Sequence, residues 1–408
     1  MKKKILLFLL LAKLNKHKNL KLEIDNFRKD FENIEVEIHE MTNLLKINTE
    51  DTYANLIERD KMTFSNLNDW KKRLSYLEDT FGKKNILIFN EIRTVNINSF
   101  KICHYLKKNG LKFFEFSDID MPTIKYNFQS LKLNKIKKYN LITLSNKMLL
   151  FFKQVFFGSL KKIFKIYPNF YLAIGRESIN YFKKNLEQHG CKLLKANSMD
   201  YNLHLISKRK YEKISAQKFG VFIEASTPFF FGDALFMRDD KKIIGNPKQW
   251  SQSLDSFFSY LEEKFKLEIF IASHPRVKHK NDRPEYYCGR KVITRELSTY
   301  IKDSSIIINR DSTGIAHGII NSIPIAFVNN FDLVSNRPNF FENQSYIASV
   351  IKKKPINMDL KITSEQEDEL FKIDHASYRD YMDNYVTMLD NQKSNSKIIS
   401  EIFNINYD

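Results

Sequence analysis

Two short motifs in the second half of the sequence carry side chains suited to binding an anion. One is His274-Pro275-Arg276, which supplies hydrogen-bond donors and positive charge. The other is Arg310-Asp311-Ser312-Thr313-Gly314, which supplies hydroxyls and backbone N–H groups just before an expected helix, Ile315–Asn321. The free N–H groups and the dipole at a helix start favour phosphate. The two motifs therefore predict a nucleotide-phosphate site, whose residues are His274, Pro275, Arg276, Arg310, Ser312, Thr313 and Gly314.

The elements around these motifs indicate a parallel sheet. An apolar run precedes His274, a second covers Ser305–Asn309, and a third covers Ile325–Val328 after the expected helix. Short apolar runs that alternate with helical patterns are typical of strands joined by crossover helices. In such sheets ligands bind beyond the carboxyl ends of the strands. Both motifs follow strands in this way, so we expect them to lie side by side.

Each motif also has an interpretation that needs no ligand. A histidine at a strand end often has a structural role, and a Ser-Thr pair before a helix can simply cap it. The occurrence of both motifs within one stretch of α/β pattern favours phosphate binding.

The first half of the chain predicts an α/β domain of residues 1–207. Its expected strands are Ile5–Ala12, Ile34–Ile38, Asn85–Phe89, Lys112–Phe116, Leu172–Ile174 and Cys191–Ala196. Helical spacing covers Asn96–Lys108, which ends at Asn109-Gly110, and Ser178–His189, which ends at Gly190. Strand–helix–strand units of this kind are typical of α/β domains.

A polar stretch, Lys208–Lys218, is expected to link this domain to a second one. The second α/β domain, residues 208–375, has a strand from Gly220 and a helix over Trp250–Phe265, followed by a helical tail over residues 376–408. Two domains are also what 408 residues predict.

The charge balance suggests an anionic partner. Lys and Arg number 66 and Asp and Glu number 48, a net charge of +18. Such an excess favours a nucleotide, an acidic glycan, a membrane surface or nucleic acid. The chain is also rich in Lys, Asn and Ile, and this bias raises the net charge without any function.

Several classes of protein are excluded by missing patterns. The three cysteines are far apart and form no Cys-x-x-Cys pair, so they suggest neither a disulfide framework nor a zinc site, and they fit a reducing cytoplasm. Nucleic-acid-binding signatures, Walker A, GxGxxG and Gly-x-Ser-x-Gly patterns are absent. The apolar run at residues 5–12 resembles a signal peptide but is followed by Lys13 without a small-residue cleavage site. We interpret it as a buried strand, since it is too short to cross a bilayer.

The motifs resemble those of two groups of bacterial proteins. Transferases with CMP- or CDP-activated donors, including sialyltransferases, polysialyltransferases and teichoic-acid polymerases, carry a His-Pro element and a later Ser/Thr pair, matched here by His274-Pro275 and Ser312-Thr313. Surface-polysaccharide proteins look similar over residues 170–330, through Ser198-Met199-Asp200-Tyr201-Asn202, Phe222-Ile223-Glu224 up to Pro228, and both motifs. Asn202 and Glu224 stand where that group has Asp, so a metal or catalytic role for acids at these positions is in doubt.

The resemblance implies two Rossmann-like domains facing a cleft, the GT-B-like architecture, with the acceptor on the first domain and the nucleotide donor on the second. It implies a glycosyltransferase of capsule or lipopolysaccharide synthesis that uses a CMP-activated acidic sugar without a metal or cofactor. Two alternatives stay open: a CDP-dependent polyol-phosphate transferase, and a non-catalytic glycan-binding partner. Nucleic acid is not an expected partner.

An inverting transferase needs a general base for the acceptor hydroxyl. The candidates are three acids near strand ends, Glu224, Glu91 and Asp200. Each is individually more typical of a helix cap or an ion pair.

The basic, aromatic segment Lys147–Lys165 would suit an anionic membrane surface if it formed a helix. We therefore expect a cytoplasmic protein that can lie against the inner face of the plasma membrane and meet a lipid-linked glycan there. The alternative is an ordinary core helix with a solvated lysine face.

Overall fold

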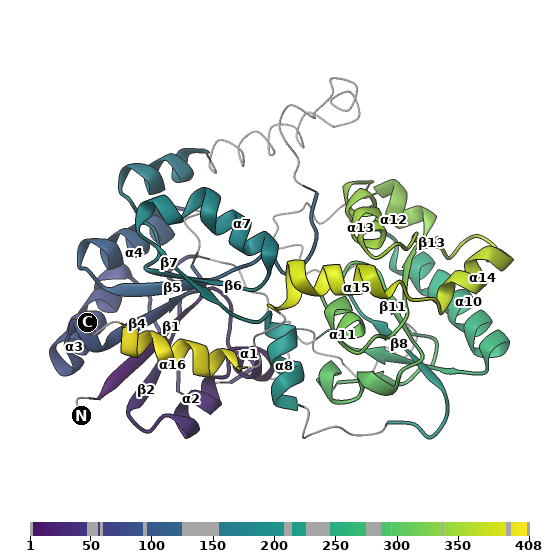
Figure 1. Ribbon diagram of the computed structural model, residues 1–408, viewed down its shortest axis with the longest axis horizontal. Helices are drawn as coiled ribbons and strands as arrows, with labels where there is room; N and C mark the ends of the chain where they lie inside the picture. Colours follow the sequence, from purple (N-terminus) through teal and green to yellow (C-terminus); the bar gives the residue numbers. More distant parts are fainter. Residues whose placement is uncertain are drawn as a thin grey trace.

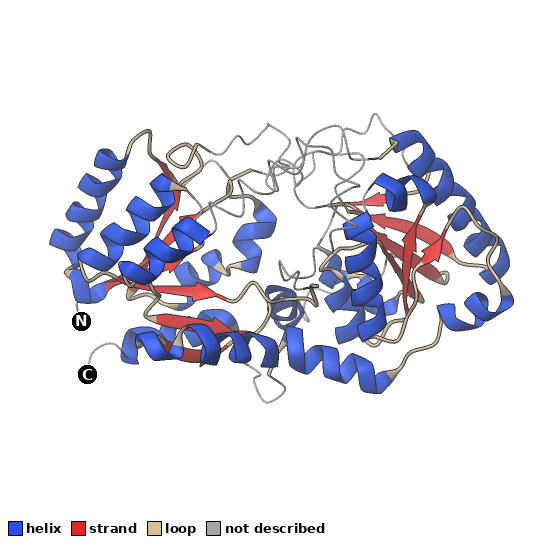
Figure 2. Ribbon diagram, turned by 90° about the horizontal axis from the view of Figure 1, so that it is seen from above, coloured by secondary structure: helices blue, strands red, loops and turns tan. Residues whose placement is uncertain are grey.

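The computed structural model describes residues 3–46, 56–57, 60–92, 96–124, 155–207, 214–225, 245–274, 287–294, 296–336, 338–388 and 393–405. They form two α/β domains, each built on one parallel sheet with helices on both faces (Figure 2). This confirms the fold class expected from the sequence, two Rossmann-like domains followed by helices at the carboxyl end. Among the described residues, no helix is both long and apolar enough to span a bilayer.

The first sheet has the order β3-β2-β1-β4-β5-β6-β7, and every pair in it is parallel. Its strands are β1 (Lys4–Leu10), β2 (Ile34–Glu40), β3 (Met62–Thr63), β4 (Ile86–Asn90), β5 (Lys112–Phe116), β6 (Phe170–Ala173) and β7 (Lys192–Lys195). The helices around it are α1 (Lys16–Lys21), α2 (Ile24–Asp30), α3 (Leu67–Phe81), α4 (Ile97–Lys108), α7 (Arg176–Asn185) and α8 (Met199–Ser207).

The apolar run near the amino end is a buried strand of this sheet, β1, which lies between β2 and β4, as interpreted. Leu6 and Phe8 of β1 pack into the core on one face, and Leu7 and Leu9 pack into the core on the other. A strand buried on both faces is apolar at every position, which is typical of parallel sheets. The run therefore needs no membrane to explain it.

The second sheet has the order β10-β9-β8-β11-β12-β13 and is parallel throughout. Its strands are β8 (Phe219–Ile223), β9 (Glu268–Ala272), β10 (Val292–Ile293), β11 (Ile306–Asn309), β12 (Ile325–Asn329) and β13 (Ile356–Asn357). Its helices are α10 (Pro247–Phe265), α11 (Ile315–Ile320), α12 (Phe331–Asn336), α13 (Pro338–Val350), α14 (Ser364–Leu370) and α15 (His375–Tyr381), and α15 continues as a π-helical turn, Met382–Val386.

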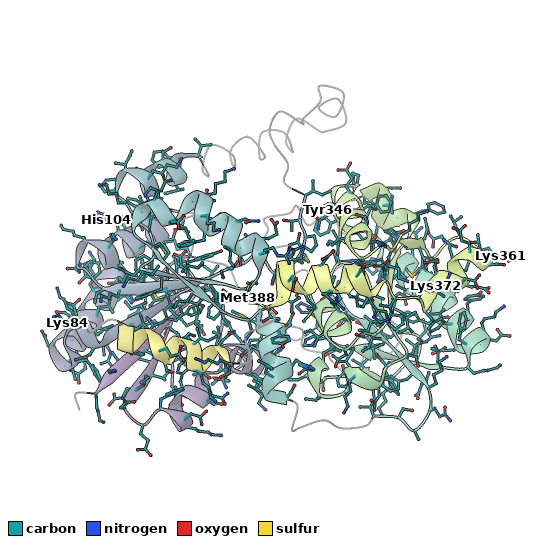
Figure 3. All side chains as sticks on the ribbon, in the orientation of Figure 1. Lys84, His104, Tyr346, Lys361, Lys372 and Met388 are labelled. Carbon is teal, nitrogen blue, oxygen red and sulfur yellow. The ribbon has the colours of Figure 1, made fainter. Side chains whose placement is uncertain are left out.

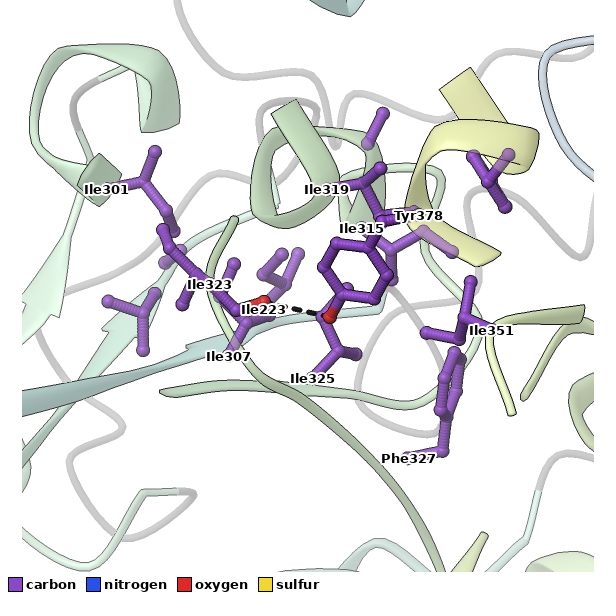
Figure 4. Packing of buried hydrophobic residues seen from close by; sticks show 14 of the residues in the cluster. Ile223, Ile301, Ile307, Ile315, Ile319, Ile323, Ile325, Phe327, Ile351 and Tyr378 are labelled. Carbon is purple, nitrogen blue, oxygen red and sulfur yellow. Dashed lines mark hydrogen bonds between the residues drawn. The ribbon is translucent and has the colours of Figure 1, made fainter. Parts of the chain in front are cut away.

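The core on one face of this sheet holds α11 in place (Figure 4). Ile315 and Ile319 of α11 are buried against Ile307 and Ile325 of the neighbouring strands. Tyr378 of α15 closes the cluster, and its hydroxyl donates to the Ile323 carbonyl oxygen at 2.9 Å. The start of α11 is thereby fixed at the carboxyl end of β11.

The end of the chain returns to the first domain. The last helix, α16 (Asn395–Ile405), buries Ile398, Ile402 and Phe403 in the same core as Leu6 and Phe8 (Figure 1). Helix α15 packs in the core of the second domain instead. The expected helical tail, residues 376–408, is thus divided between the two domains, and the chain crosses the domain junction a second time.

Candidate functional site

Three neighbouring strands of the second sheet end at the same edge, and the predicted motifs follow two of them. Strand β8 lies between β9 and β11, with Ile223 opposite both Ala272 and Asn309. His274, Glu224 and Arg310 follow these three strands directly, so all three leave the sheet at its carboxyl edge. This is the edge where parallel α/β sheets bind ligands.

Glu224 fixes the backbone of His274. The Glu224 side chain is buried, with 2% of the residue exposed, and its Oε2 accepts a hydrogen bond from the His274 backbone N–H at 2.8 Å. Its own N–H donates to the Ala272 carbonyl oxygen at 3.0 Å. Pro275 and Arg276 lie outside the described residues. The Glu224 carboxylate therefore serves as a hydrogen-bond acceptor that holds the start of the loop after β9.

Arg310 is buried and paired with its neighbour. Its Nε lies 2.8 Å from Asp311 Oδ1, and its carbonyl oxygen accepts from Gln344 Nε2 at 2.7 Å. A small pocket beside it, of about 30 Å³, is lined by Arg310, Asp311, Asn329, Leu333, Val334, Phe340, Phe341 and Gln344. This volume holds about two water molecules, so the pocket as it stands is too small for a nucleotide base.

The Ser312-Thr313-Gly314 turn is closed by local hydrogen bonds. Asn309 Oδ1 accepts from the Ser312 N–H at 3.1 Å, and Ser312 Oγ accepts from the Gly314 N–H at 3.2 Å. Gly314 is the residue before α11, and a Cβ there would lie 3.2 Å from two side-chain carbons of Ile223. A small residue is therefore needed for α11 to approach β8. The Ser312 oxygen thus accepts a hydrogen bond within the turn, and its O–H can still donate one to a ligand.

A second group of polar residues lies where the domains meet. We call His17, Lys21, Asp120, Asp200, Glu296 and His317 the junction cluster. Lys21 Nζ on α1 is 2.8 Å from Asp200 Oδ1 on α8, and His317 Nε2 on α11 is 3.8 Å from the same oxygen. His17 Nδ1 on α1 is 2.9 Å from Glu296 Oε2. Figure 1 shows α1, α8 and α11 together at the junction.

The surroundings of Asp200 and His317 set their protonation states. Burial favours the neutral acid in Asp200, but the ion pair with Lys21 outweighs burial and, with the positive charge that His317 carries when protonated, lowers the pKa of Asp200 to about 2. Burial lowers the pKa of His317, although Asp200 acts in the opposite direction. Near pH 7, therefore, Asp200 is a carboxylate and His317 is a neutral imidazole. His317 Nδ1 is buried and has no hydrogen-bond partner within the described part of the chain.

Asp120 differs from the other acids of the cluster. It lies on the loop after β5, is only partly buried, and has a pKa raised to about 6 by burial and by the nearby Asp200 carboxylate. The same loop reaches the second domain, because Met121 packs against that domain's core and the Ile124 N–H donates to Asn343 Oδ1 at 3.2 Å. Asp120 is thus a carboxyl group at the junction that titrates close to neutral pH.

Glu91, one of the two leading predicted bases, holds the loop after β1. Its Oε2 accepts from the Leu11 N–H at 2.7 Å and from Lys18 Nζ at 2.6 Å. Glu224 does the same for the loop after β9 in the second domain. The structure therefore places only Asp200, of the three predicted acids, within the junction cluster.

Asn202 has a structural role that an aspartate could not fill. It is fully buried, donates from Nδ2 to Glu23 Oε1 at 2.8 Å, and accepts at Oδ1 from the Asn395 N–H at 2.9 Å. An aspartate would place a second carboxylate against Glu23. The amide ties α2 to α16, which explains why this position departs from the acid of the resembling proteins.

Five residues of the junction cluster were not predicted from the sequence: His17, Lys21, Asp120, Glu296 and His317. The sequence patterns around these five residues indicated a functional role only weakly. Asp120 stands after a predicted strand, in Ser117-Asp118-Ile119-Asp120, and His17 follows the first strand in a lysine-rich stretch. Within the described residues, no group of three or more His, Cys, Asp or Glu side chains is arranged to hold a metal ion.

Comparison with known proteins gives distant structural likenesses only. No protein-family model matches the chain, and no curated protein matches it. Among solved structures, UDP-GlcNAc 2-epimerase from Neisseria meningitidis, bound to UDP-GlcNAc, gives a TM-score of 0.46 at 11% identity, covering 99% of this chain and 100% of that one. The S. aureus MnaA–UDP structure gives 0.49 at 11% identity over 98% and 95%. The wall teichoic acid polymerase TagF, H548A, gives 0.49 at 12% identity over 99% and 89%.

These scores lie below 0.5, so they carry no conclusion about chemistry.

Proposed function

We propose that the protein is a glycosyltransferase that moves a sugar from a nucleotide donor to a hydroxyl of a glycan acceptor in bacterial surface-polysaccharide synthesis, capsule or lipopolysaccharide. The observation that carries the proposal is the position of α11, which begins directly after Ser312-Thr313-Gly314 and places His317 3.8 Å from Asp200 of the first domain. The carboxyl edge of the second sheet presents the His274 and Ser312-Thr313 motifs. Acidic and imidazole groups from both domains lie at the junction.

The donor site is assigned to the second domain. His274, Ser312 and Thr313 would donate to the departing phosphate, with Arg276 and Arg310 as the sources of positive charge and Pro275 and Gly314 shaping the two loops. Preorganised donors aimed at a developing charge are often the largest catalytic contribution. The donor proposed is a CMP-activated acidic sugar, because the motifs resemble those of enzymes with cytidine nucleotide donors. No metal or other cofactor is part of the proposal.

Asp120 is the leading candidate for the general base. A base should have a pKa close to the working pH, and the pKa of about 6 of Asp120 fits this better than the pKa of about 2 of Asp200. Glu91 and Glu224, the earlier candidates, are held as acceptors by loop backbone. Asp200 supports this role, because its negative charge raises the pKa of Asp120.

The step balances without another reactant. Asp120 takes the proton of the acceptor hydroxyl, and the oxygen attacks the anomeric carbon of the donor. The bond from that carbon to the phosphate oxygen breaks, and its electron pair leaves with the nucleotide. With a CMP-activated sugar, the products are the extended glycan and CMP.

A thermal-shift screen with CMP, CDP, UDP and GDP tests the donor assignment. A ligand that binds only the folded protein stabilises it, by about 2.7 kcal/mol at a concentration 100 times its Kd. We expect CMP to raise the Tm and the UDP and GDP additions to leave it unchanged. A response to CDP but not to CMP would indicate a polyol-phosphate transferase, and product analysis would then identify the group transferred. No response to any nucleotide, together with binding of a glycan, would favour a non-catalytic glycan-binding partner.

A further inference from the structure

Exposed apolar side chains gather on one short segment of the first domain. The structure describes eleven large apolar side chains as exposed, and four of them lie within residues 155–164: Val155, Phe156, Ile163 and Phe164. Ile163 is 70% exposed and Phe156 is 58% exposed. Residues 155–163 are helical. An apolar cluster of this kind is unusual on a protein surface in water and indicates a contact surface.

This segment is fixed to helix α4. The Phe164 ring lies 5.4 Å from the Phe100 ring and 4.9 Å from the His104 ring, measured between centroids. Phe100 and His104 stack on each other along α4. Figure 3 labels His104 on this side of the first domain. The apolar side chains are therefore carried on a rigid support.

A basic groove continues from the same support. It has a volume of about 480 Å³ and lies between α3 and α4, where it is lined by Leu67, Lys71, Lys101, His104, Tyr105, Lys108 and Asn109. Lys101 and Lys108 are exposed. His104 belongs to the groove and also contacts Phe164, so the groove and the apolar segment form one continuous surface.

The charge of this surface is of one sign. Helix α4 and residues 155–165 together contain six lysines and no acidic residue. The acids nearby are on α3 and do not line the groove: Asp69 accepts from Asn66 Nδ2, Glu78 pairs with Lys83, and Asp79 is exposed. Apolar side chains flanked by lysines match the interface of a bilayer with anionic lipids, where apolar groups enter the acyl boundary and lysines meet the head groups.

We propose that the surface formed by residues 155–165 and the α3–α4 groove docks the protein on an anionic lipid bilayer. The sequence suggested only that Lys147–Lys165 suits a membrane; residues 147–154 lie outside the described part, and the groove adds a second element to the docking surface. The proposal does not depend on the nucleotide site, which is on the other domain.

Sedimentation with vesicles tests the proposal. The full chain should sediment with phosphatidylcholine vesicles that contain phosphatidylglycerol, less with phosphatidylcholine alone, and less as salt is raised. Phe156→Ser with Ile163→Ser, and separately Lys101→Glu with Lys108→Glu, should each reduce the bound fraction at least several-fold.

Matched controls come from the second domain, where Leu360 is 57% exposed and Lys361 is exposed beside it. Leu360→Ser and Lys361→Glu should bind vesicles like the wild type, and all variants should keep the wild-type Tm. Equal vesicle binding by wild type and both double variants would overturn the proposal, as would no binding by the wild type. It would also fail if the Phe156 and Ile163 variant instead dissolved a dimer seen in sedimentation velocity, because the surface would then contact a second copy of the chain.

Discussion

Nε2 of His317 lies 3.8 Å from Oδ1 of Asp200, and the two residues come from helices of different domains. Helix α11 follows β11 and the Ser312-Thr313 motif in the second domain, and α8 follows β7 in the first domain. This pair therefore links α11, which begins at the expected donor site, to α8 of the first domain. The state of the pair depends on Lys21, which keeps Asp200 ionised.

Asp120→Asn should reduce turnover by about a hundredfold to ten-thousandfold, which is the usual contribution of a general base. The amide keeps the size of the side chain but has no basic oxygen. In the wild type, kcat/KM should rise with pH through about 6 and level off above it, because Asp120 must be ionised to accept a proton. Steady-state kinetics over this pH range provide the measurement.

Asp118→Asn is the matched control, since Asp118 is exposed and only two residues away. It should keep the rate, and its pH profile should move only slightly to lower pH, because the Asp118 carboxylate makes the smallest of the contributions that raise the pKa of Asp120. If Asp120→Asn also retains wild-type turnover while folded, the base lies elsewhere, and the amide variants of Glu91, Glu224 and Asp200 become the next to measure.

His274→Ala should lower turnover by about a hundredfold or more, as the loss of one preorganised donor typically does. The fold should survive, because Glu224 holds residue 274 through its backbone N–H and this bond remains in the variant. Rate measurements should be paired with a circular-dichroism melting curve. Wild-type turnover in this variant would remove His274 from the proposed site.

Ser312 and Thr313 can be separated by calorimetry with CMP. Ser312→Ala removes the acceptor of the Gly314 N–H, so it should lower stability by about 1 kcal/mol, as the loss of a cap does. Thr313→Val should weaken CMP binding and leave the Tm unchanged, because within the described part of the chain no side-chain hydrogen bond holds Thr313 in the turn. Unchanged CMP affinity in both variants would leave the motif with a capping role only.

Lys21→Met should destabilise the protein by about 3–5 kcal/mol, because it leaves the buried Asp200 carboxylate without its closest positive partner. Adding Asp200→Asn should recover part of the loss, since the double variant has no buried charge to compensate. Urea denaturation of the wild type and the three variants measures the coupling. A double variant as unstable as the sum of the single ones would show that the two residues do not interact.

Acidification should destabilise the protein as pH falls through about 6.5. Burial lowers the pKa of both His39 and His317 from the ordinary value of 6.5. As the pH falls, these two histidines are therefore protonated in the unfolded chain before they are protonated in the folded one. Stability is therefore present above this pH and lost below it, by at most about 1.4 kcal/mol per pH unit for each group. His317→Gln should flatten the slope, whereas a substitution of the exposed His375 should not. Equal slopes in wild type and His317→Gln would show that His317 is protonated in the folded state.

Much of the architecture was predictable from local pattern. Runs such as residues 5–10 and 306–309 are apolar at every position because their strands are buried on both faces, and such runs identify parallel strands in any sequence. Strand order then follows from short crossover connections, so His274 and Ser312 could be expected at one edge before any coordinates were known. Asn96 and Gly190 marked helix ends through capping and a left-handed turn.

The junction cluster, by contrast, exists only in three dimensions. His17, Asp120 and His317 lie far apart in sequence, and no local pattern distinguishes them from surface residues. The pKa of Asp120 is raised by burial and by Asp200, and that of Asp200 is lowered by Lys21 and by His317 of the other domain, so the difference between the two acids depends on long-range contacts. The return of α16 to the first core is decided in the same way, because the apolar face of a helix does not specify which core it covers. Sequence set the strands and the loops that follow them, whereas long-range packing decided which charges meet.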